Sequence, residues 1–151
     1  MKKQFINVAI IFALLFICHI PYAQGLSVTK TAIAKINSLY FELFKNKDTA
    51  IVNLYTPDAC LLAPNAPAIC GKAALSKDFV DTYKGGLVLG VKFATKDVYG
   101  SGEYVTEEGY WQVFGTDGRV IDKGKYLKLW KKEKDGLKIF RDIFNSNQKS
   151  K

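Results

Sequence analysis

Four β-rich runs separated by turn residues fill the second half of the sequence, and no other feature constrains the fold as strongly. The runs span residues 87–98, 104–114, 119–131 and 137–145. The breaks between them are a few residues long and contain glycine, so each is short enough for a hairpin loop. The sequence therefore predicts four strands joined as an antiparallel meander.

Apolar residues at helical spacing come before these strands. Residues 27–46 predict a long amphipathic helix with Ser27 as its cap. A short second helix is expected to begin at Asp48 and to end at Pro57, and a third spans residues 72–83 before a glycine pair. Helices followed by strands indicate an α+β fold in which the helices cover one face of a sheet.

The first 23 residues have the three-part layout of a secretory signal: two lysines, an apolar stretch over 8–17, and the segment Pro21-Tyr22-Ala23 before Gln24. A membrane-spanning helix needs about 20 apolar residues, so we expect cleavage near Ala23 and a periplasmic or secreted protein. The alternative is lipidation at Cys18. A small residue is expected immediately before a lipidated cysteine, and Ile17 stands there instead.

Cleavage would leave one domain over residues 24–145 and a polar tail over 146–151. It would also remove His19, the only histidine of the chain. Without histidine, a mature protein has neither a Ser-His-Asp nor a Cys-His mechanism, and it lacks the commonest transition-metal ligand. No phosphate-binding loop or metal-ligand cluster is present in the sequence, so we expect no cofactor and no metal.

Two cysteines, Cys60 and Cys70, remain after cleavage, and they flank a turn signal centred on Asn65. If a three-residue loop closes a hairpin there, the two cysteines lie opposite each other at a Cα separation that a disulfide tolerates. An oxidising compartment would preserve the bond. The alternative is a pair of buried thiols packed as small hydrophobic groups.

Basic residues are concentrated in one part of the chain, with 11 lysines and arginines against four acids over residues 119–151. This surplus suits contact with an anionic membrane surface or an acidic ligand, although such a surplus is more often a solvated face. Export and the lack of an aromatic RNA-binding motif argue against nucleic acid.

Two segments resemble a known family. Residues 48–75, which begin DTAIVNLYTPDA and end CGKAAL, resemble the amino-terminal half of SnoaL-like domains in the nuclear transport factor 2-like superfamily. Residues 102–145, including DGRV, GKY, LWK and LKIFRDIFN, resemble its subgroup called domain of unknown function 4440.

The resemblance implies a cone: a strongly bent antiparallel sheet wrapped around the long amino-terminal helix, with three helices in all. It also implies an apolar cavity open at one end, and often a homodimer formed through the outer face of the sheet. Members of the superfamily include isomerases, dehydratases, cyclases, hydrolases and purely associating domains, so the fold alone does not define an activity.

Tyr40 precedes Asp48 by eight positions, the spacing at which ketosteroid isomerase keeps the tyrosine that donates to the developing oxyanion. The isomerase's base would fall at Ala63, which takes up no proton, and its second acid would fall among lysines and a tyrosine near 123–126. That specific reaction is therefore not expected. Tyr40 is then a ligand-binding candidate or an ordinary helix tyrosine.

Glu107 is the clearest candidate for acid or base chemistry. Alternation along its run places it on the more apolar face with Val105, Gly109, Trp111 and Val113. A carboxylate facing a partly dry cavity has a raised pKa and can exchange protons with a ligand. Alternatively, a bulge turns it outward or a lysine pairs with it.

Asp142 is the second catalytic candidate, since it interrupts the apolar run 139–144. Lys125, on the neighbouring strand, is expected to pair with it across the hairpin and tie the strands together, or to orient polar groups inside the cone. Candidates for lining the pocket are Trp111, Tyr126, Trp130 and Asn145. Aromatic residues in a sheet are equally explained as core.

These observations favour an exported domain that binds a small, mostly apolar ligand in its cone. An isomerase, dehydratase or cyclase that uses Glu107 or Asp142 with Tyr40 as donor is the first alternative. The second is an interaction module that works through its outer sheet face. Whether the chain is an enzyme stays open at this point.

Overall fold

The computed structural model describes residues 20–149, with side chains from residue 25 onward. Most of the predicted signal segment, including Cys18 and His19, lies outside the described residues. The elements follow in the order α2 (Ile20–Lys45), η1 (Thr49–Leu54), β1 (Tyr55–Leu62), β2 (Ile69–Cys70), α3 (Lys72–Gly85), β3 (Val88–Tyr99), β4 (Tyr104–Gly115), β5 (Val120–Glu133) and β6 (Gly136–Ser146). No helix among these residues is both long and apolar enough to cross a membrane.

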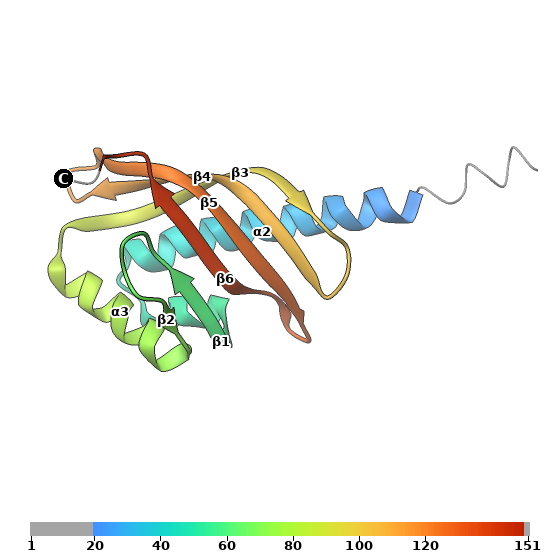
Figure 1. Ribbon diagram of the computed structural model, residues 1–151, viewed down its shortest axis with the longest axis horizontal. Helices are drawn as coiled ribbons and strands as arrows, with labels where there is room; N and C mark the ends of the chain where they lie inside the picture. Colours follow the sequence, from blue (N-terminus) through green and yellow to red (C-terminus); the bar gives the residue numbers. More distant parts are fainter. Residues whose placement is uncertain (1–19, 150–151) are drawn as a thin grey trace, which may run out of the picture.

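The six strands form one sheet in the order β2-β1-β6-β5-β4-β3 (Figure 1). The predicted meander is confirmed, because β3, β4, β5 and β6 pair antiparallel in succession. The sheet is nevertheless mixed, since β1 runs parallel to β6. The long connection through α3 and four strands, β2 to β5, makes this parallel pairing feasible, because parallel neighbours need an extended crossover.

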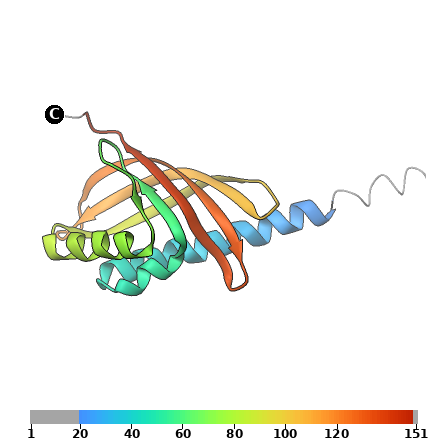
Figure 2. The same cartoon turned by 60° about the horizontal axis from the view of Figure 1, so that its bottom comes forward.

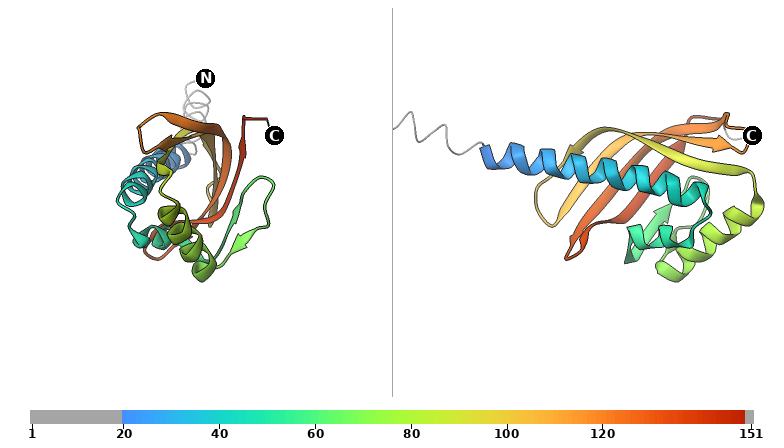
Figure 3. Two further views of the ribbon diagram at one scale, coloured as in Figure 1. Left: turned by 90° about the vertical axis from the view of Figure 1, so that its left-hand side faces the viewer. Right: turned by 180° about the vertical axis from the view of Figure 1, so that it is seen from behind.

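The sheet bends around α2, as the end-on and rear views show (Figure 3). One stripe of α2 is buried, at Ile33, Asn37, Tyr40 and Phe44, which is the spacing of a single helix face. The helix begins upstream of the predicted cap: the Ser27 carbonyl accepts from the Thr31 hydroxyl at 3.0 Å, as inside a helical turn. The predicted α+β cone is confirmed.

The short second helix begins as predicted, because the Asp48 carboxylate accepts from the Ala50 amide at 2.8 Å. Pro57 does not end it. The helix stops at Leu54, and Pro57 lies inside β1, where the register with β6 shifts between Tyr55 and Cys60. An interrupted ladder tolerates a residue that has no amide hydrogen to donate.

The Cys60–Cys70 disulfide is present, with the two residues directly opposite each other in the β1–β2 ladder. The connection spans residues 63–68 rather than three residues, and Asn65 within it has a φ of 56°. Closing this loop stabilises the fold by about 3 kcal/mol on the chain-entropy argument. The bond is compatible with an oxidising compartment.

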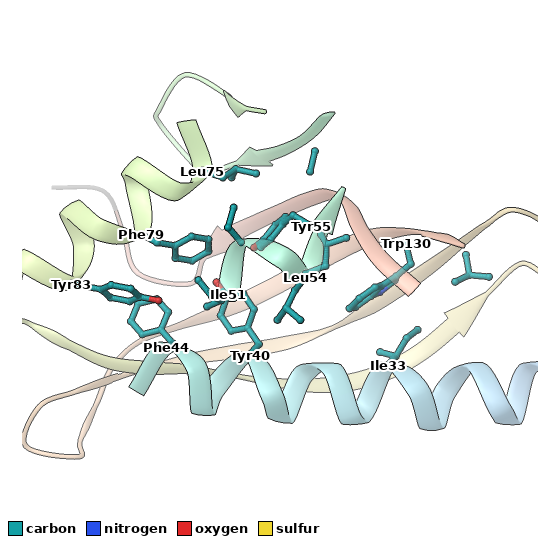
Figure 4. Close-up of a cluster of buried hydrophobic side chains, with 14 of the residues drawn as sticks. Ile33, Tyr40, Phe44, Ile51, Leu54, Tyr55, Leu75, Phe79, Tyr83 and Trp130 are labelled. Carbon is teal, nitrogen blue, oxygen red and sulfur yellow. The ribbon is translucent and has the colours of Figure 1, made fainter. Parts of the chain in front are cut away.

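Aromatic side chains from α2 and α3 meet inside the bend of the sheet (Figure 4). Tyr40 and Phe44 of α2 face Phe79 and Tyr83 of α3, with ring centroids 5.2–6.3 Å apart. The strands curl over α2 while η1 and α3 close the region below them (Figure 2). This packing leaves a hollow between α3 and the sheet.

Candidate functional site

A cavity of about 260 Å³ lies between α3, α2 and the inner face of the sheet. Fourteen residues line it. Six are aromatic: Tyr40, Phe44, Phe79, Phe93, Trp111 and Phe144. Three are aspartates: Asp78, Asp122 and Asp142. The remainder are Leu61, Thr82 and three valines, so the cavity is an apolar, ring-lined hollow with carboxylates.

Asp142 is the most deeply buried of the three carboxylates, with 3% of its surface exposed. The Tyr55 hydroxyl donates to its Oδ2 at 3.2 Å. Its Oδ1 accepts no hydrogen bond from any described residue. Burial raises the pKa of Asp142, and the nearby positive charge of Lys128 only partly opposes that rise.

Tyr40 and Tyr55 stand beside Asp142. Figure 4 shows their hydroxyls directed toward the same region of the interior. Burial, first of all, raises the pKa of each phenol, and the neighbouring Asp142 charge adds to the rise. Both tyrosines are therefore neutral hydrogen-bond donors at physiological pH.

Glu107 faces the interior, as the strand alternation predicts, and is completely buried. It does not line the cavity. Its Oε1 accepts from the side chains of Asn37, Thr95 and Tyr126 at 2.8, 2.6 and 2.5 Å, and its Oε2 accepts from the Trp130 indole at 3.0 Å. Glu107 is thus the centre of a polar cluster.

Lys128 is a second fully buried charge, and the sequence reasoning missed it. Its Nζ donates to Asn37 Oδ1 at 3.3 Å and lies 3.1 Å from the centroid of the Phe93 ring. Burial lowers the pKa of Lys128, while Asp142 and Glu107 oppose that change. Alternation along β5 puts Lys128 on the same face as Tyr126 and Trp130, and this pattern could have identified it as an inward-facing lysine.

The expected Lys125–Asp142 ion pair is wrong. Lys125 lies opposite Asn145, and the residue opposite Asp142 is Lys128. Lys125 is exposed and lines a depression on the outer face of the sheet, whereas Asp142 points inward. Lys125 and Lys128 are three positions apart on the same strand, so their side chains point to opposite faces of the sheet.

The residues predicted to line the pocket occupy different places in the structure. Trp111 lines the cavity, and its indole donates to the backbone carbonyls of Lys125 and Asn145 at 3.1 and 3.2 Å. Tyr126 and Trp130 do not line it; they donate to Glu107 instead. Asn145 is exposed and lines the outer depression of about 400 Å³. The structure thus brings together Tyr40, Trp111 and Asp142 around the cavity.

Among the described residues 20–149, no group of three or more histidine, cysteine, aspartate or glutamate side chains is arranged to hold a metal ion.

The raised pKa of Asp142 predicts a pH-dependent stability. The folded chain keeps this proton over a range in which the unfolded chain has lost it. As pH rises above the ordinary value of 3.8, the wild type should therefore lose stability relative to Asp142→Asn. The slope is at most about 1.4 kcal/mol per pH unit in that window. Urea unfolding of both proteins between about pH 4 and 7 measures it.

Asp81→Asn is the matched control for this titration. A hydrogen bond from Lys77 lowers the pKa of exposed Asp81, so its contribution appears above the unfolded pKa and is lost as pH falls. Relative to the wild type, Asp81→Asn should therefore show no slope between about pH 4 and 7, and a slope of opposite sign to that of Asp142→Asn only below 3.8. A slope of the same sign for both would contradict the desolvated environment assigned to Asp142.

Known proteins resemble this chain in structure rather than in sequence. No protein-family model and no curated protein matches it. A protein from Novosphingobium aromaticivorans, described as NTF2-like with a cystatin-like fold, has a TM-score of 0.70 at 14% identity and covers 89% of this chain and 92% of its own. A ketosteroid isomerase-like protein from Erwinia carotovora atroseptica has a TM-score of 0.61 at 20% identity, covering 78% and 96%.

An NTF2-like superfamily protein from Salmonella enterica serovar Typhimurium has a TM-score of 0.63 at 16% identity, and the match covers 83% of this chain and 95% of that protein. At these identities the likeness defines the fold alone. The chain has the nuclear transport factor 2-like fold, which is also described as cystatin-like or ketosteroid isomerase-like.

Proposed function

We propose that this chain binds a small, mostly apolar ligand in the cavity between α3 and the sheet. The observation that carries the proposal is the cavity itself, about 260 Å³ lined by six aromatic residues, with the buried Asp142 among them. Ligand sites are typically apolar hollows with a few polar groups that fix orientation. The volume suits a ligand about the size of one substituted ring.

Filling the cavity tests this proposal. Val113→Trp should place an indole in the hollow and abolish the binding of neutral aromatic probes such as indole and benzyl alcohol. Gln112→Trp adds the same group to the exposed face of the same strand and should leave binding within about twofold of the wild type. Titrations followed by NMR measure both. Equal binding by the two variants would place the ligand elsewhere.

The proposal includes export and membership of the subgroup called domain of unknown function 4440. Export is supported by the layout of residues 1–23 and by the disulfide, which suits an oxidising compartment. Amino-terminal sequencing of the protein recovered from expressing cells should begin near Gln24. A start at Met1 would contradict export by cleavage.

Acid–base catalysis on a bound ligand is the second candidate, because Asp142 and the donor Tyr40 line the same cavity. Burial raises the pKa of Asp142, and a carboxyl with a raised pKa is suited to acid or base chemistry on a bound ligand. Glu107 is a weaker candidate, since four donors occupy it away from the cavity. If Asp142→Asn leaves a discovered turnover intact, the role of Asp142 is refuted.

The outer sheet face is the proposed dimer surface. Tyr110, Leu127 and Ile143 are each about half exposed there, at 51%, 46% and 47%. Self-association would cover apolar side chains that are otherwise in water. Sedimentation at increasing concentration should reveal a dimer, and Leu127→Lys should reduce it. A monomer at all concentrations would remove this surface.

A further inference from the structure

The charged residues that line the cavity are all acidic. Three of its lining residues are aspartates, and none of the described lining residues is a lysine or arginine. The whole chain has a formal net charge of +8, so this negative hollow runs against the overall balance. Carboxylates gathered in a recess of low polarity concentrate their field on whatever enters it.

One carboxylate oxygen of Asp142 has no hydrogen-bond donor in the described part of the chain. Only 3% of the Asp142 surface is exposed, and only Oδ2 has a hydrogen-bond donor, the Tyr55 hydroxyl. Oδ1 has no partner among the described residues, although Asp142 lines the cavity. No fully buried side-chain oxygen among the described residues lacks a hydrogen-bond partner, so Oδ1 is accessible from the cavity. A donor or a positive charge that enters the cavity can therefore reach it.

Lys128 balances only part of the negative charge of the buried carboxylates. Its ammonium contacts Asn37 and the Phe93 ring, and it makes no ion pair within 4.0 Å of Asp142. Two buried carboxylates, Glu107 and Asp142, share this one ammonium in the described interior. The neutral phenols Tyr40 and Tyr55 add no charge. When Asp142 is ionised, the two carboxylates exceed this ammonium by one negative charge, and a cationic ligand would favour that ionised state.

The aromatic lining fits a cation equally well. Six rings surround the cavity, and the face of an aromatic ring attracts an ammonium group once water is excluded. The protein already uses this interaction in its own interior, where Lys128 Nζ lies within 3.1–5.7 Å of four ring centroids. The same chemistry is available to a ligand on the cavity side.

We propose that the ligand of this cavity carries a positive charge, as an amine or a quaternary ammonium attached to a small apolar group. This inference rests on the proposed function, because it names the class of ligand for the same cavity. Asp142 at its deep end would pair with the cationic group, and Asp78 and Asp122 would favour its entry.

Four probes of similar size test the inference: benzylamine, phenyltrimethylammonium, benzyl alcohol and benzoate. NMR titration of the folded protein should show the two cations binding at least about tenfold tighter than benzyl alcohol, with benzoate weakest. Asp142→Asn should weaken the cations about tenfold and leave benzyl alcohol within about twofold.

Asp78→Asn is the second variant, since it lies on a helix surface and does not depend on the buried network. It should weaken the cations by a smaller factor. Asp81→Asn removes the same charge from the exposed side of α3 and should change nothing. Neither the probe ranking nor the Asp78 test requires the Asp142 variant to fold.

The outcomes separate the two proposals. If benzyl alcohol or benzoate binds as tightly as the cations, the charge inference is overturned and the apolar ligand site stands. If none of the four probes perturbs the cavity residues, the proposed function fails, and the inference fails with it. Cation binding that survives both Asp142→Asn and Asp78→Asn unchanged would also overturn the inference.

Discussion

Replacing Glu107 with alanine should destabilise the protein by about 3–5 kcal/mol. The carboxylate is completely buried and accepts hydrogen bonds from four side chains, so its removal leaves four donors without their acceptor. The buried ammonium of Lys128 loses a neighbouring negative charge at the same time. Urea unfolding measures the change, which is a large part of the 5–15 kcal/mol typical of a domain.

Glu108→Ala is the matched control, one residue further along β4 and on the opposite face. Its carboxylate forms a surface ion pair with Lys96 at 3.0 Å. Partly exposed pairs of this kind contribute about 0–1 kcal/mol, so the control should stay close to the wild type. A loss of similar size in the two variants would mean that the cluster around Glu107 does not stabilise the interior.

Replacing Gly124 with alanine is expected to destabilise the fold by at least about 3 kcal/mol. A Cβ atom at this position would lie 1.8 Å from the backbone oxygen of Asn145 and 2.8 Å from the Trp111 indole nitrogen. The nearer atom belongs to the backbone, so β5 and β6 would have to separate there. The indole would also lose the carbonyl acceptors that orient it at the cavity.

Gly102→Ala is the control for this substitution. It lies in the β3–β4 connection, where a Cβ would meet nothing within 4 Å and where no positive φ is required. Thermal unfolding should place it within about 1 kcal/mol of the wild type. If Gly124→Ala is equally mild, the close approach of β5 and β6 is not a constraint on the fold.

The candidate site could be predicted only in part. Strand alternation correctly turned Glu107 and Trp111 inward, because the two-residue period is a local property of the backbone. It did not separate a residue that lines a cavity from one buried in a polar cluster. That distinction depends on which side chains arrive from other elements, as when Asn37 of α2 donates to Glu107 70 positions away.

Much of the fold was determined by local sequence. The β-rich runs and the glycine-containing turns between them were enough to predict four strands. Their ends lie within about two residues of those observed. The Cys60–Cys70 register followed from the turn centred on Asn65, since a hairpin pairs residues at equal distances from its centre. Such features depend on neighbours only a few positions apart.

Tertiary structure decided the rest. The parallel pairing of β1 with β6, the position of Pro57 inside a strand and the pairing of Lys128 rather than Lys125 opposite Asp142 all join distant segments. Register between distant strands is set by how the whole sheet bends over α2, and one residue of shift exchanges the two faces. For that reason the sequence alone determined the elements and their order, whereas packing decided which charges share the interior and which of them reach the cavity.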